Sequence, residues 1–401
     1  MKKKLILFIF LFYSLISKAQ TFEQSLNSDK VQWKFYCTTP SPLGKAGMGL
    51  TPSSLERAGV KFSLSPLGRA GEGLPATVPG TIHLDLLDNK LIPDPFYADN
   101  EKHLQWIDTL DWVYETTFDV DSNLLKQQQI ELQFDGLDTY ADVYLNENHV
   151  SLNMNLEFTK YSSDNMFVKW ICWTAKDYLK VKNNQLKIVF HSTIKESKKL
   201  KAAFEKEHGY SLPEGERVFV RKAQYQFGWD FAPRFLGCGI WRGVKLIGWN
   251  DVRITNVEFN TEKIFKHDSA LVNLKVNLQF DVNRMERLQG ADNCPRGISA
   301  YLLIHKSNGI DTIKLSHSTS EIEDEISTSI IFRKPKVWNC NGEGNQELDS
   351  IYLSYETSFI EADSKLRKVS AETKTLNLPI RTAEFIHEKD SIGESFYFKL
   401  N

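Results

Sequence analysis

The sequence is poor in cysteine and carries almost no net charge. Its 401 residues include five cysteines, which form neither a CxxC pair nor a Cys/His cluster at zinc-ligand spacing. A disulfide-built scaffold and a structural zinc site are therefore excluded, although one or two disulfides would suit an oxidising compartment. The formal net charge of −2 gives no reason to expect nucleic acid or an anionic membrane as partner. We expect neither a metal nor a cofactor.

Motifs for common catalytic chemistry are also missing. The sequence has no GxSxG, no HExxH and no phosphate-binding glycine loop. The repeating strand–helix pattern of a (β/α)₈ barrel, which needs about 250 residues, does not appear. The acidic cluster of Glu321, Glu323, Asp324 and Glu325 is typical of a solvated loop or an edge strand. We therefore assign no catalytic residue.

A long apolar run occurs at the N-terminus, where residues 5–16 follow three lysines. The run is too short to span a bilayer, which takes about 20 residues, and no cysteine follows it to carry a lipid. Residues 17–19 supply small side chains at the spacing that a signal peptidase reads. We expect residues 1–19 to be a cleaved signal peptide and the mature protein to be periplasmic or secreted, without membrane attachment.

What the sequence does contain is aromatic residues and a hydrophobic period of two. Aromatic residues make up 12% of the chain, which suits strands and also the flat surfaces that stack on sugar rings. Apolar and polar residues alternate in several short segments: 112–120, 130–134, 141–145 and 186–190. Short strands separated by polar turns predict a β-sandwich or jelly roll. Two helices interrupt it, at residues 81–89 and 197–208.

A second set of alternating segments begins after Asn250. Residues 252–257, 271–280 and 301–305 have strand character, and Asn308-Gly309 predicts a turn before residues 312–315. This part is more charged and has fewer tryptophans than the first, and its size suits an immunoglobulin-like sandwich. We predict an all-β chain whose two domains cover residues 20–250 and 251–401.

One region departs from this pattern. Residues 41–50 (SPLGKAGMGL) nearly recur as residues 65–74 (SPLGRAGEGL). The repeated units are short, glycine-rich and poor in core-forming residues, so they could not stack into a solenoid. We interpret residues of about 38–74 as an inserted loop, with an ordinary long Gly/Pro loop as the alternative.

Several strings together resemble one protein family. They are PATVPGTIH at residues 75–83, LIPDPFY at 91–97, DWVY at 111–114 and RKAQYQFGWD at 221–230. In order and spacing they resemble the N-terminal domain of the β-mannosidases of glycoside hydrolase family two. Residues 335–339 and 395–401 are similar, more weakly, to the sandwich domain that follows it. The resemblance implies a jelly-roll, galactose-binding-like β-sandwich and then an immunoglobulin-like one, with the catalytic barrel expected beyond residue 401.

The resemblance also implies a sugar-binding role for Trp229 and Asp230. A tryptophan face offers an apolar platform for a sugar ring, and a carboxylate accepts hydrogen bonds from two neighbouring hydroxyls. The alternative is a core aromatic beside a turn-capping carboxylate. The family pattern Gly-Trp-Asp-Trp-Gly-Pro is altered here, because Phe231 and Ala232 replace Trp and Gly. Alanine restricts a backbone position at which glycine allows positive φ.

The function expected from this resemblance is that of a non-catalytic part of a β-mannosidase. The two catalytic glutamates of a retaining glycosidase lie on the barrel in this family, and no residue here matches them. The expected ligand is a mannose-containing oligosaccharide or glycan, and the expected protein partner is a separately encoded catalytic barrel. A stand-alone carbohydrate-binding module and a structural sandwich left by a truncated gene are the alternatives.

Overall fold

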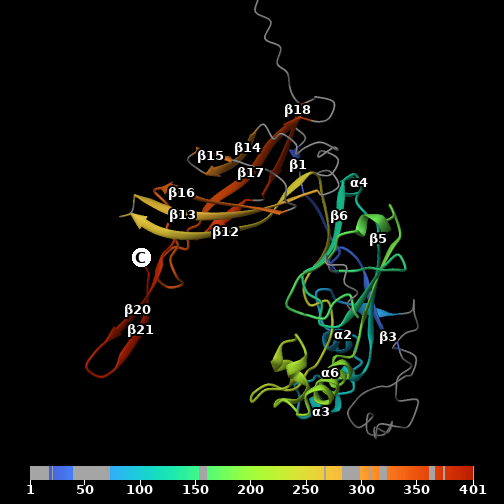
Figure 1. Cartoon of the computed structure of the whole chain (residues 1–401). Coiled ribbons are helices and arrows are strands. Elements are labelled where there is room, and N and C mark those ends of the chain that lie inside the picture. The colour runs from blue at the N-terminus through green and yellow to red at the C-terminus, as the bar shows by residue number, and fades with distance from the viewer. Residues whose placement is uncertain are drawn as a thin grey trace, which may run out of the picture. The chain divides into compact units, whose positions relative to one another are not determined.

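The computed structural model describes residues 18–19, 21–38, 73–152, 160–265, 268–281, 299–306, 309–315, 323–360, 366–373 and 375–400. Within these residues the contacts divide the chain into two compact units (Figure 1). One unit is Phe22–Gly248, and the other joins the described residues from Trp249 onward to residues 18, 19 and 21. Strands dominate both units and none of the described sheets closes into a barrel, which confirms the predicted all-β fold.

Two antiparallel sheets form the Phe22–Gly248 unit. The larger has the order β4-β3-β5-β10-β7-β8 and the smaller the order β2-β11-β6-β9. Their bounds are β2 (Phe22–Ser25), β3 (Trp33–Cys37), β4 (Leu74–Ala76), β5 (Trp112–Phe118), β6 (Gln129–Phe134), β7 (Ala141–Leu145), β8 (Asn148–His149), β9 (Trp170–Cys172), β10 (Asn184–Phe190) and β11 (Val244–Trp249).

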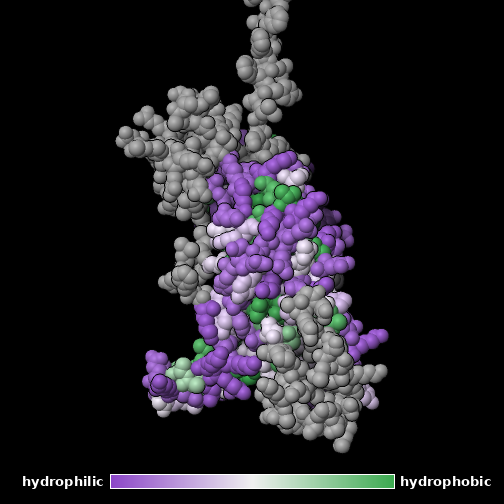
Figure 2. All heavy atoms as spheres, turned by 90° about the vertical axis from the view of Figure 1, so that its right-hand side faces the viewer, coloured by the Kyte–Doolittle hydropathy of each residue, from purple (hydrophilic) through white to green (hydrophobic). Residues whose placement is uncertain are grey.

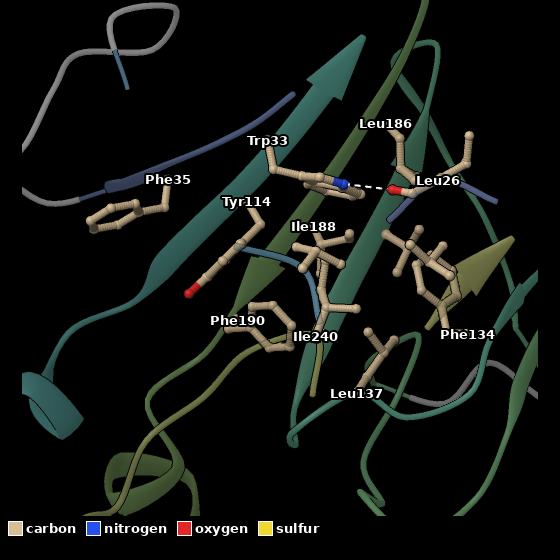
Figure 3. Packing of buried hydrophobic residues seen from close by; sticks show 14 of the residues in the cluster. Leu26, Trp33, Phe35, Tyr114, Phe134, Leu137, Leu186, Ile188, Phe190 and Ile240 are labelled. Atoms are coloured by element: carbon tan, nitrogen blue, oxygen red, sulfur yellow. Dashed lines mark hydrogen bonds between the residues drawn. The ribbon is translucent and has the colours of Figure 1, made fainter. Parts of the chain in front are cut away.

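The period-two segments become these strands because one set of side chains on each strand enters the core. Trp112, Tyr114, Thr116 and Phe118 all lie on one face of β5 and are all buried. Figure 3 shows the aromatic centre of this core, where the ring of Tyr114 packs edge to face against the ring of Phe190 in β10. The two ring centres are 5.7 Å apart. Burial of such large side chains stabilises each by about 1.5–3 kcal/mol.

Buried polar groups in this core have partners. The Trp33 indole nitrogen donates to the Leu26 carbonyl at 2.7 Å (Figure 3). The Tyr114 hydroxyl donates to Asp85 at 2.5 Å, and the Thr77 backbone N–H donates to the same carboxylate at 2.7 Å. Burial raises the pKa of Asp85 to about 6, against the lowering effect of these two hydrogen bonds.

A tight two-residue turn follows β7. Asn146 and Glu147 both have positive φ, at 49° and 68°, and they connect β7 to β8. This backbone is the one that two-residue hairpin loops favour, because its twist matches that of the flanking strands. The predicted loop of about 38–74 lies largely outside the described residues. Its two ends are described, and there β3 and β4 pair antiparallel, with Phe35 opposite Leu74.

Helices occupy the connections of this unit. They are α2 (Ile82–Asp88), α3 (Asn100–His103), α4 (Ser122–Leu125), α5 (Ala175–Tyr178) and α6 (Thr193–His208), with 3₁₀ turns η2 (Ile107–Thr109), η3 (Gly215–Phe219) and η4 (Gln224–Phe227). The prediction for residues 197–208 was wrong at its start, because Ser192 caps the helix by accepting from the Lys195 N–H at 3.3 Å. The helix ends at Gly209, whose φ of 76° suits a left-handed C-terminal residue. No described helix is long and apolar enough to cross a membrane.

The unit from Trp249 onward is a second set of sheets. One has the order β12-β13-β16, and another has the order β1-β18-β17-β14-β15 with β19 beside β17. Their bounds are β1 (Lys18–Ala19), β12 (Val252–Phe265), β13 (Ser269–Phe280), β14 (Ser299–Lys306), β15 (Gly309–Leu315), β16 (Glu323–Arg333), β17 (Asp349–Ile360), β18 (Leu366–Glu372) and β19 (Leu376–Leu378). Inward-facing residues of β13, such as Val272 and Leu274, join Leu302, Leu353 and Tyr355 in a core of their own.

Two further strands, β20 (Ala383–Lys389) and β21 (Glu394–Leu400), form a separate two-stranded sheet. The surface shown in Figure 2 is largely hydrophilic, with hydrophobic residues gathered in a few separate groups. Of the cysteines, Cys172 and Cys238 are buried free thiols and Cys340 is a partly exposed one.

Candidate functional site

The predicted sugar-binding residues lie in a tight turn that follows η4. The Trp229 N–H donates to the Ala232 carbonyl at 3.1 Å, and the Ala232 N–H donates back to the Trp229 carbonyl at 3.2 Å. Gly228 enters the turn with a φ of 96°, which a residue with a side chain rarely adopts. Ala232 does not have a positive φ. The turn therefore closes with alanine at the position where the family pattern has glycine.

The turn holds its side chains toward solvent. The Trp229 side chain is 48% exposed and that of Phe231, at the tip, is 88% exposed. Asp230 is exposed as well. The alternative of a core aromatic therefore does not describe Trp229. The Arg217 guanidinium lies 5.2 Å from the centre of the Trp229 ring, a cation–π distance that restrains the indole while part of its surface stays open.

A fully buried ion pair connects the two ends of the segment that carries this turn. The Lys222 ammonium pairs with Asp138 and also donates to the Gly237 carbonyl at 2.9 Å, so it joins two ends of the segment. Asp138 further accepts from the Thr139 hydroxyl at 2.5 Å and from the Gln226 amide at 3.3 Å. With these donors the carboxylate is satisfied, which a buried charge requires. Nothing in the sequence pattern signals this pair.

A second ion pair fixes the segment after the turn. Arg234 pairs with the largely buried Asp108 and donates to the Gln105 side chain, whose amide donates to the Arg234 carbonyl at 3.0 Å. Burial raises the pKa of Asp108 although the Arg234 charge lowers it. Gln224 also braces the loop, because its side-chain amide donates to the Arg217 carbonyl at 2.9 Å, whereas Arg221 is exposed.

A pocket of about 250 Å³ opens between α2 and the residues just before the turn. Its walls are mostly apolar, and its polar groups include His83, Asp138 and Gln226. Its lining is Thr81, His83, Leu84, Leu87, Pro95, Phe96, Asp138, Tyr225, Gln226, Phe235 and Gly237. The volume is below the range of roughly 300–1,000 Å³ that is usual for drug-sized ligands. By itself the pocket offers room for a small polar ligand or for one end of a larger one.

His83 lines this pocket. Burial lowers its pKa to about 4, and the charges of Lys222 and Arg234 act in the same direction. The imidazole is therefore neutral at neutral pH. Its ring packs against that of Phe235, with 5.5 Å between the ring centres. A neutral ring packed in this way supports the walls of the pocket.

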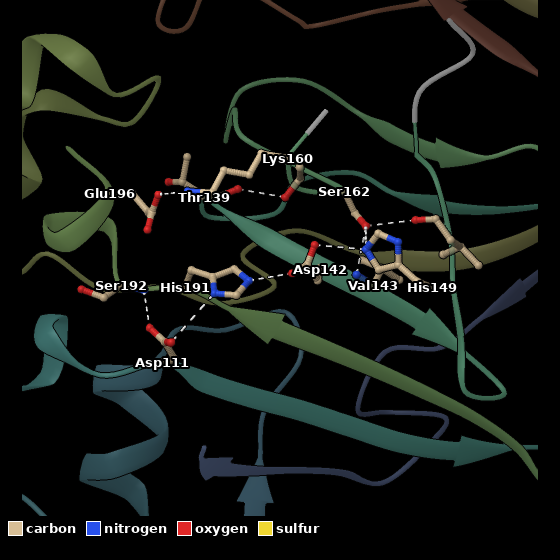
Figure 4. A network of polar contacts seen from close by, with 12 residues as sticks. Asp111, Thr139, Asp142, Val143, His149, Lys160, Ser162, His191, Ser192 and Glu196 are labelled. Carbon is tan, nitrogen blue, oxygen red and sulfur yellow. Dashed lines mark hydrogen bonds and ion pairs between the residues drawn. The ribbon is translucent and has the colours of Figure 1, made fainter. Parts of the chain in front are cut away.

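The unit also contains a polar network that invites an acid–base interpretation (Figure 4). His191 lies between Asp111 and Asp142, and Asp142 also contacts His149, which is 3.3 Å from the Ser162 hydroxyl. His149 uses its Nε2 for both Asp142 and Ser162, so it cannot relay a proton from one to the other. Ser162 is buried and donates to the Val150 carbonyl at 2.9 Å, which removes it as a nucleophile.

The remaining candidate groups among the described residues have ordinary structural roles. The described residues contain no group of three or more His, Cys, Asp or Glu side chains that could hold a metal ion. From the acidic cluster at residues 321–325, the side chain of Glu325 forms an exposed ion pair with Lys275 at 2.8 Å. Such a pair is typical of a solvated sheet face.

The comparisons with known proteins agree with this architecture. Residues 63–242 match the glycosyl hydrolase 2 galactose-binding domain-like family. The chain is 31% identical to a β-mannosidase of Bos taurus, over 82% of this chain and 35% of that protein. It is 29% identical to a β-mannosidase of Mus musculus, over 86% of this chain and 37% of that protein. The crystal structure of a β-D-mannosidase from Dictyoglomus thermophilum superposes with a TM-score of 0.67 at 27% identity, covering 95% of this chain and 39% of that one.

The Phe22–Gly248 unit thus contains a galactose-binding-like domain of the glycosyl hydrolase 2 class. More particularly, the chain corresponds to the N-terminal portion of a family-two β-mannosidase, as the sequence motifs indicated. The chain spans little more than a third of the length of these relatives.

Proposed function

We propose that this chain is the part of a β-mannosidase-like enzyme that contacts the terminal sugar of a β-mannoside without cleaving it. The observation that carries the proposal is the turn at Trp229, which presents a half-exposed indole and an exposed carboxylate at adjacent positions of the chain. Because a buried ion pair and a partly buried one fix the segment on both sides of the turn, little conformational entropy would be lost when a sugar binds.

In this proposal, hydrolysis needs groups that the chain does not supply. A retaining glycosidase uses two carboxylates about 5–5.5 Å apart, one as acid/base and one as nucleophile. Trp229 and Asp230 would orient the substrate for such a pair, held on a catalytic barrel in the same or a separately encoded polypeptide. We expect the purified chain to release no aryl alcohol from an aryl β-mannoside above background. Turnover by the chain alone would contradict the proposal.

The contribution of the turn can be tested by binding. Titration calorimetry of the chain with manno-oligosaccharides should give weak binding, because one turn forms only one wall of a site. Trp229→Ala and Asp230→Asn should each weaken binding by about tenfold or more, which corresponds to loss of one good contact. Tyr352→Ala, which removes an exposed aromatic ring from the other unit, is the matched control and should leave affinity unchanged.

A stand-alone carbohydrate-binding module is the second candidate. It is favoured by the pocket beside the turn, which residues of this chain form by themselves. Tight binding of mannan by the chain alone would support this candidate over the first. Equal binding by the chain and by Trp229→Ala would count against the first candidate but not against the second, because Trp229 does not line this pocket.

We also propose that the protein is exported and that it acts in the periplasm or outside the cell. The support is the charged and then apolar N-terminus with small residues at 17–19. N-terminal sequencing of the exported protein should find Gln20 first. Retention of the apolar run in the mature protein would contradict this proposal.

A further inference from the structure

An open trough lies on the sheet β12-β13-β16, on the face that is turned away from the core. Its volume is about 560 Å³, within the range of roughly 300–1,000 Å³ that is usual for ligand sites. Figure 1 shows the three strands side by side. Their register puts two rows of three polar side chains into the lining of the trough. The rows are Glu258, Lys275 and Ser327, and Asn260, Asn273 and Ser329.

The face that carries the trough is unusually rich in amide side chains. Asparagine is depleted in strands, because it packs poorly on a pleated sheet. Four asparagines nevertheless share this face of two neighbouring strands: Asn256, Asn260, Asn273 and Asn277. The hydrophobic core lies on the opposite face of β13. Neither strand formation nor core packing therefore accounts for these amides, and a polar face of this kind is stable in water without a protein cover.

Hydrogen bonds across all three strands hold the centre of the trough in place. The Asn273 amide, on the central strand, donates to the Glu262 carboxylate of β12 at 3.0 Å. Its carbonyl oxygen accepts from the Ser329 hydroxyl of β16 at 2.6 Å. An amide has two N–H donors and an oxygen with two lone pairs, so these contacts orient Asn273 and leave bonding capacity for a ligand. Groups that are ordered beforehand lose little entropy on binding.

The charge of the trough restricts the class of ligand. Three carboxylates and one ammonium group lie in or beside it: Glu258, Glu262, Glu325 and Lys275. Negative charges are therefore in excess, and they repel phosphates, nucleic acid and acidic polymers. A neutral ligand avoids this repulsion.

The side chains of the trough suit a sugar chain. Amide, hydroxyl and carboxylate groups complement neighbouring sugar hydroxyls, each of which both donates and accepts hydrogen bonds. Phe259, on the edge strand β12, also lines the trough and is 37% exposed, so it offers an apolar surface to the C–H groups of a sugar ring. Adjacent strands lie about 4.8 Å apart, so one row of side chains presents its bonding groups over roughly 10 Å. That length exceeds a single sugar ring.

We propose that the trough on β12-β13-β16 binds a neutral polysaccharide through sugar units within its chain. The polysaccharide lies across the strands and meets Asn260, Asn273 and Ser329 in turn. Binding to one trough is weak, because the site has a floor but no enclosing walls. The trough belongs to a different unit from the turn at Trp229, and this inference does not rest on the function proposed for that turn.

Native gel electrophoresis through gels that contain a soluble polysaccharide tests the proposal. The full chain should be retarded by galactomannan or by hydroxyethylcellulose, which are both neutral, but not by polygalacturonate, which is acidic. Trp229→Ala should be retarded as strongly as the unaltered chain. Asn260→Ala and Asn273→Ala should each weaken the apparent affinity by about fivefold or more, as the loss of one or two hydrogen bonds predicts.

Asn377→Ala is the matched control. Asn377 is an exposed asparagine of β19 that accepts from the Ser350 hydroxyl at 2.8 Å, as Asn273 accepts from Ser329, but it lies in the other sheet of the same unit. Its replacement should leave retardation unchanged. Far-UV circular dichroism checks that each variant is folded. Asn260, on an exposed edge strand, keeps the test decisive if Asn273→Ala does not fold.

Three results would overturn the proposal. They are no retardation by either neutral polysaccharide, equal retardation by polygalacturonate, and equal retardation of the Asn260, Asn273 and Asn377 variants. Loss of retardation in Trp229→Ala would assign the binding to the turn instead. Calorimetry with mannobiose, which is too short to span the trough, reports on the turn alone, so failure of one proposal can be distinguished from failure of the other.

Discussion

Lys222 and Asp138 are the residues on which the geometry of the Trp229 turn depends most. Both side chains are essentially inaccessible to solvent, and the pair lies 84 residues apart in sequence. Lys222 reaches the Gly237 carbonyl beyond the turn, while Asp138 reaches Gln226 before it. One buried pair therefore connects the residues on both sides of the turn.

Removing one partner of this pair should be costly. Asp138→Asn leaves the Lys222 ammonium buried without its counter-charge, so we expect the free energy of unfolding to fall by about 3–5 kcal/mol. Urea unfolding followed by tryptophan fluorescence measures this loss. Glu325→Gln, which breaks the exposed pair with Lys275, is the control and should show no detectable change. An equal loss in the two variants would show that burial does not set the importance of the Asp138 pair.

At the scale of single residues, sequence reasoning reached some features and not others. Trp229 and Asp230 stand out because they form part of a contiguous string whose order is recognisable. The Lys222–Asp138 and Arg234–Asp108 pairs cannot be recognised in this way, because each joins segments that only the folded sheets bring together. Whether Trp229 and Asp230 bind sugar remains a prediction.

At the scale of elements, the Asp111–His191–Asp142 contacts join the ends of three neighbouring strands. His191 follows β10, Asp142 lies in β7 and Asp111 precedes β5. Burial alone would lower the pKa of His191, but the hydrogen bonds and charges of Asp111 and Asp142 raise it to about 9. The imidazolium form therefore ties these strand ends together at neutral pH.

This raised pKa predicts how stability depends on pH. The pKa of His191 is about 9 when folded and about 6.5 when unfolded, so its stabilisation is complete below pH 6.5 and is lost as pH rises to about 9. We expect a loss of about 2 kcal/mol over this window, less than the shift alone would imply, because the ring is partly exposed. Urea unfolding at several pH values measures it.

The matched variants separate His191 from other groups that titrate. His191→Gln should remove this slope between pH 6.5 and 9, whereas His103→Gln, at an exposed histidine, should retain it. A slope that persists in His191→Gln would assign the pH dependence to other residues.

Strand positions were more predictable than helix positions. The alternation in residues 112–120 and 186–190 survives in β5 and β10 because each of these strands has a face turned into the core. On β6, Glu131 and Gln133 are also buried, so both faces of this strand are covered and the alternation of the sequence does not report burial there. The predicted start of α6 is too late because the cap at Ser192 precedes the charged run on which the prediction was based.

At the scale of the whole molecule, the described residues form two hydrophobic cores with no member in common. One holds residues such as Tyr114 and Phe190, and the other holds residues such as Leu302 and Leu353. Each unit of this size can support its own cooperative transition. The sequence shows two sets of strands, but strand order such as β3-β5-β10-β7 depends on long-range pairing that alternation does not encode.

We expect calorimetry to resolve two unfolding transitions. Leu302→Ala, in the core of the unit from Trp249 onward, should reduce the free energy of unfolding of that unit by about 2–5 kcal/mol. The midpoint temperature of one transition should therefore fall by several degrees. Asp138→Asn should lower the other. A single transition that both variants shift equally would show that the chain unfolds as one cooperative body.

The pairing of β3 with β4 has a consequence for how this fold tolerates foreign sequence. The chain leaves the sheet after Cys37 and re-enters it at Leu74, and the strands on either side of that gap are hydrogen-bonded neighbours. Extra residues placed there need only close a loop between two anchored ends, and each doubling of loop length costs about 0.6 kcal/mol. The connection between β3 and β4 is thus a site at which evolution or protein engineering can insert a segment while the strands of the sandwich keep their register.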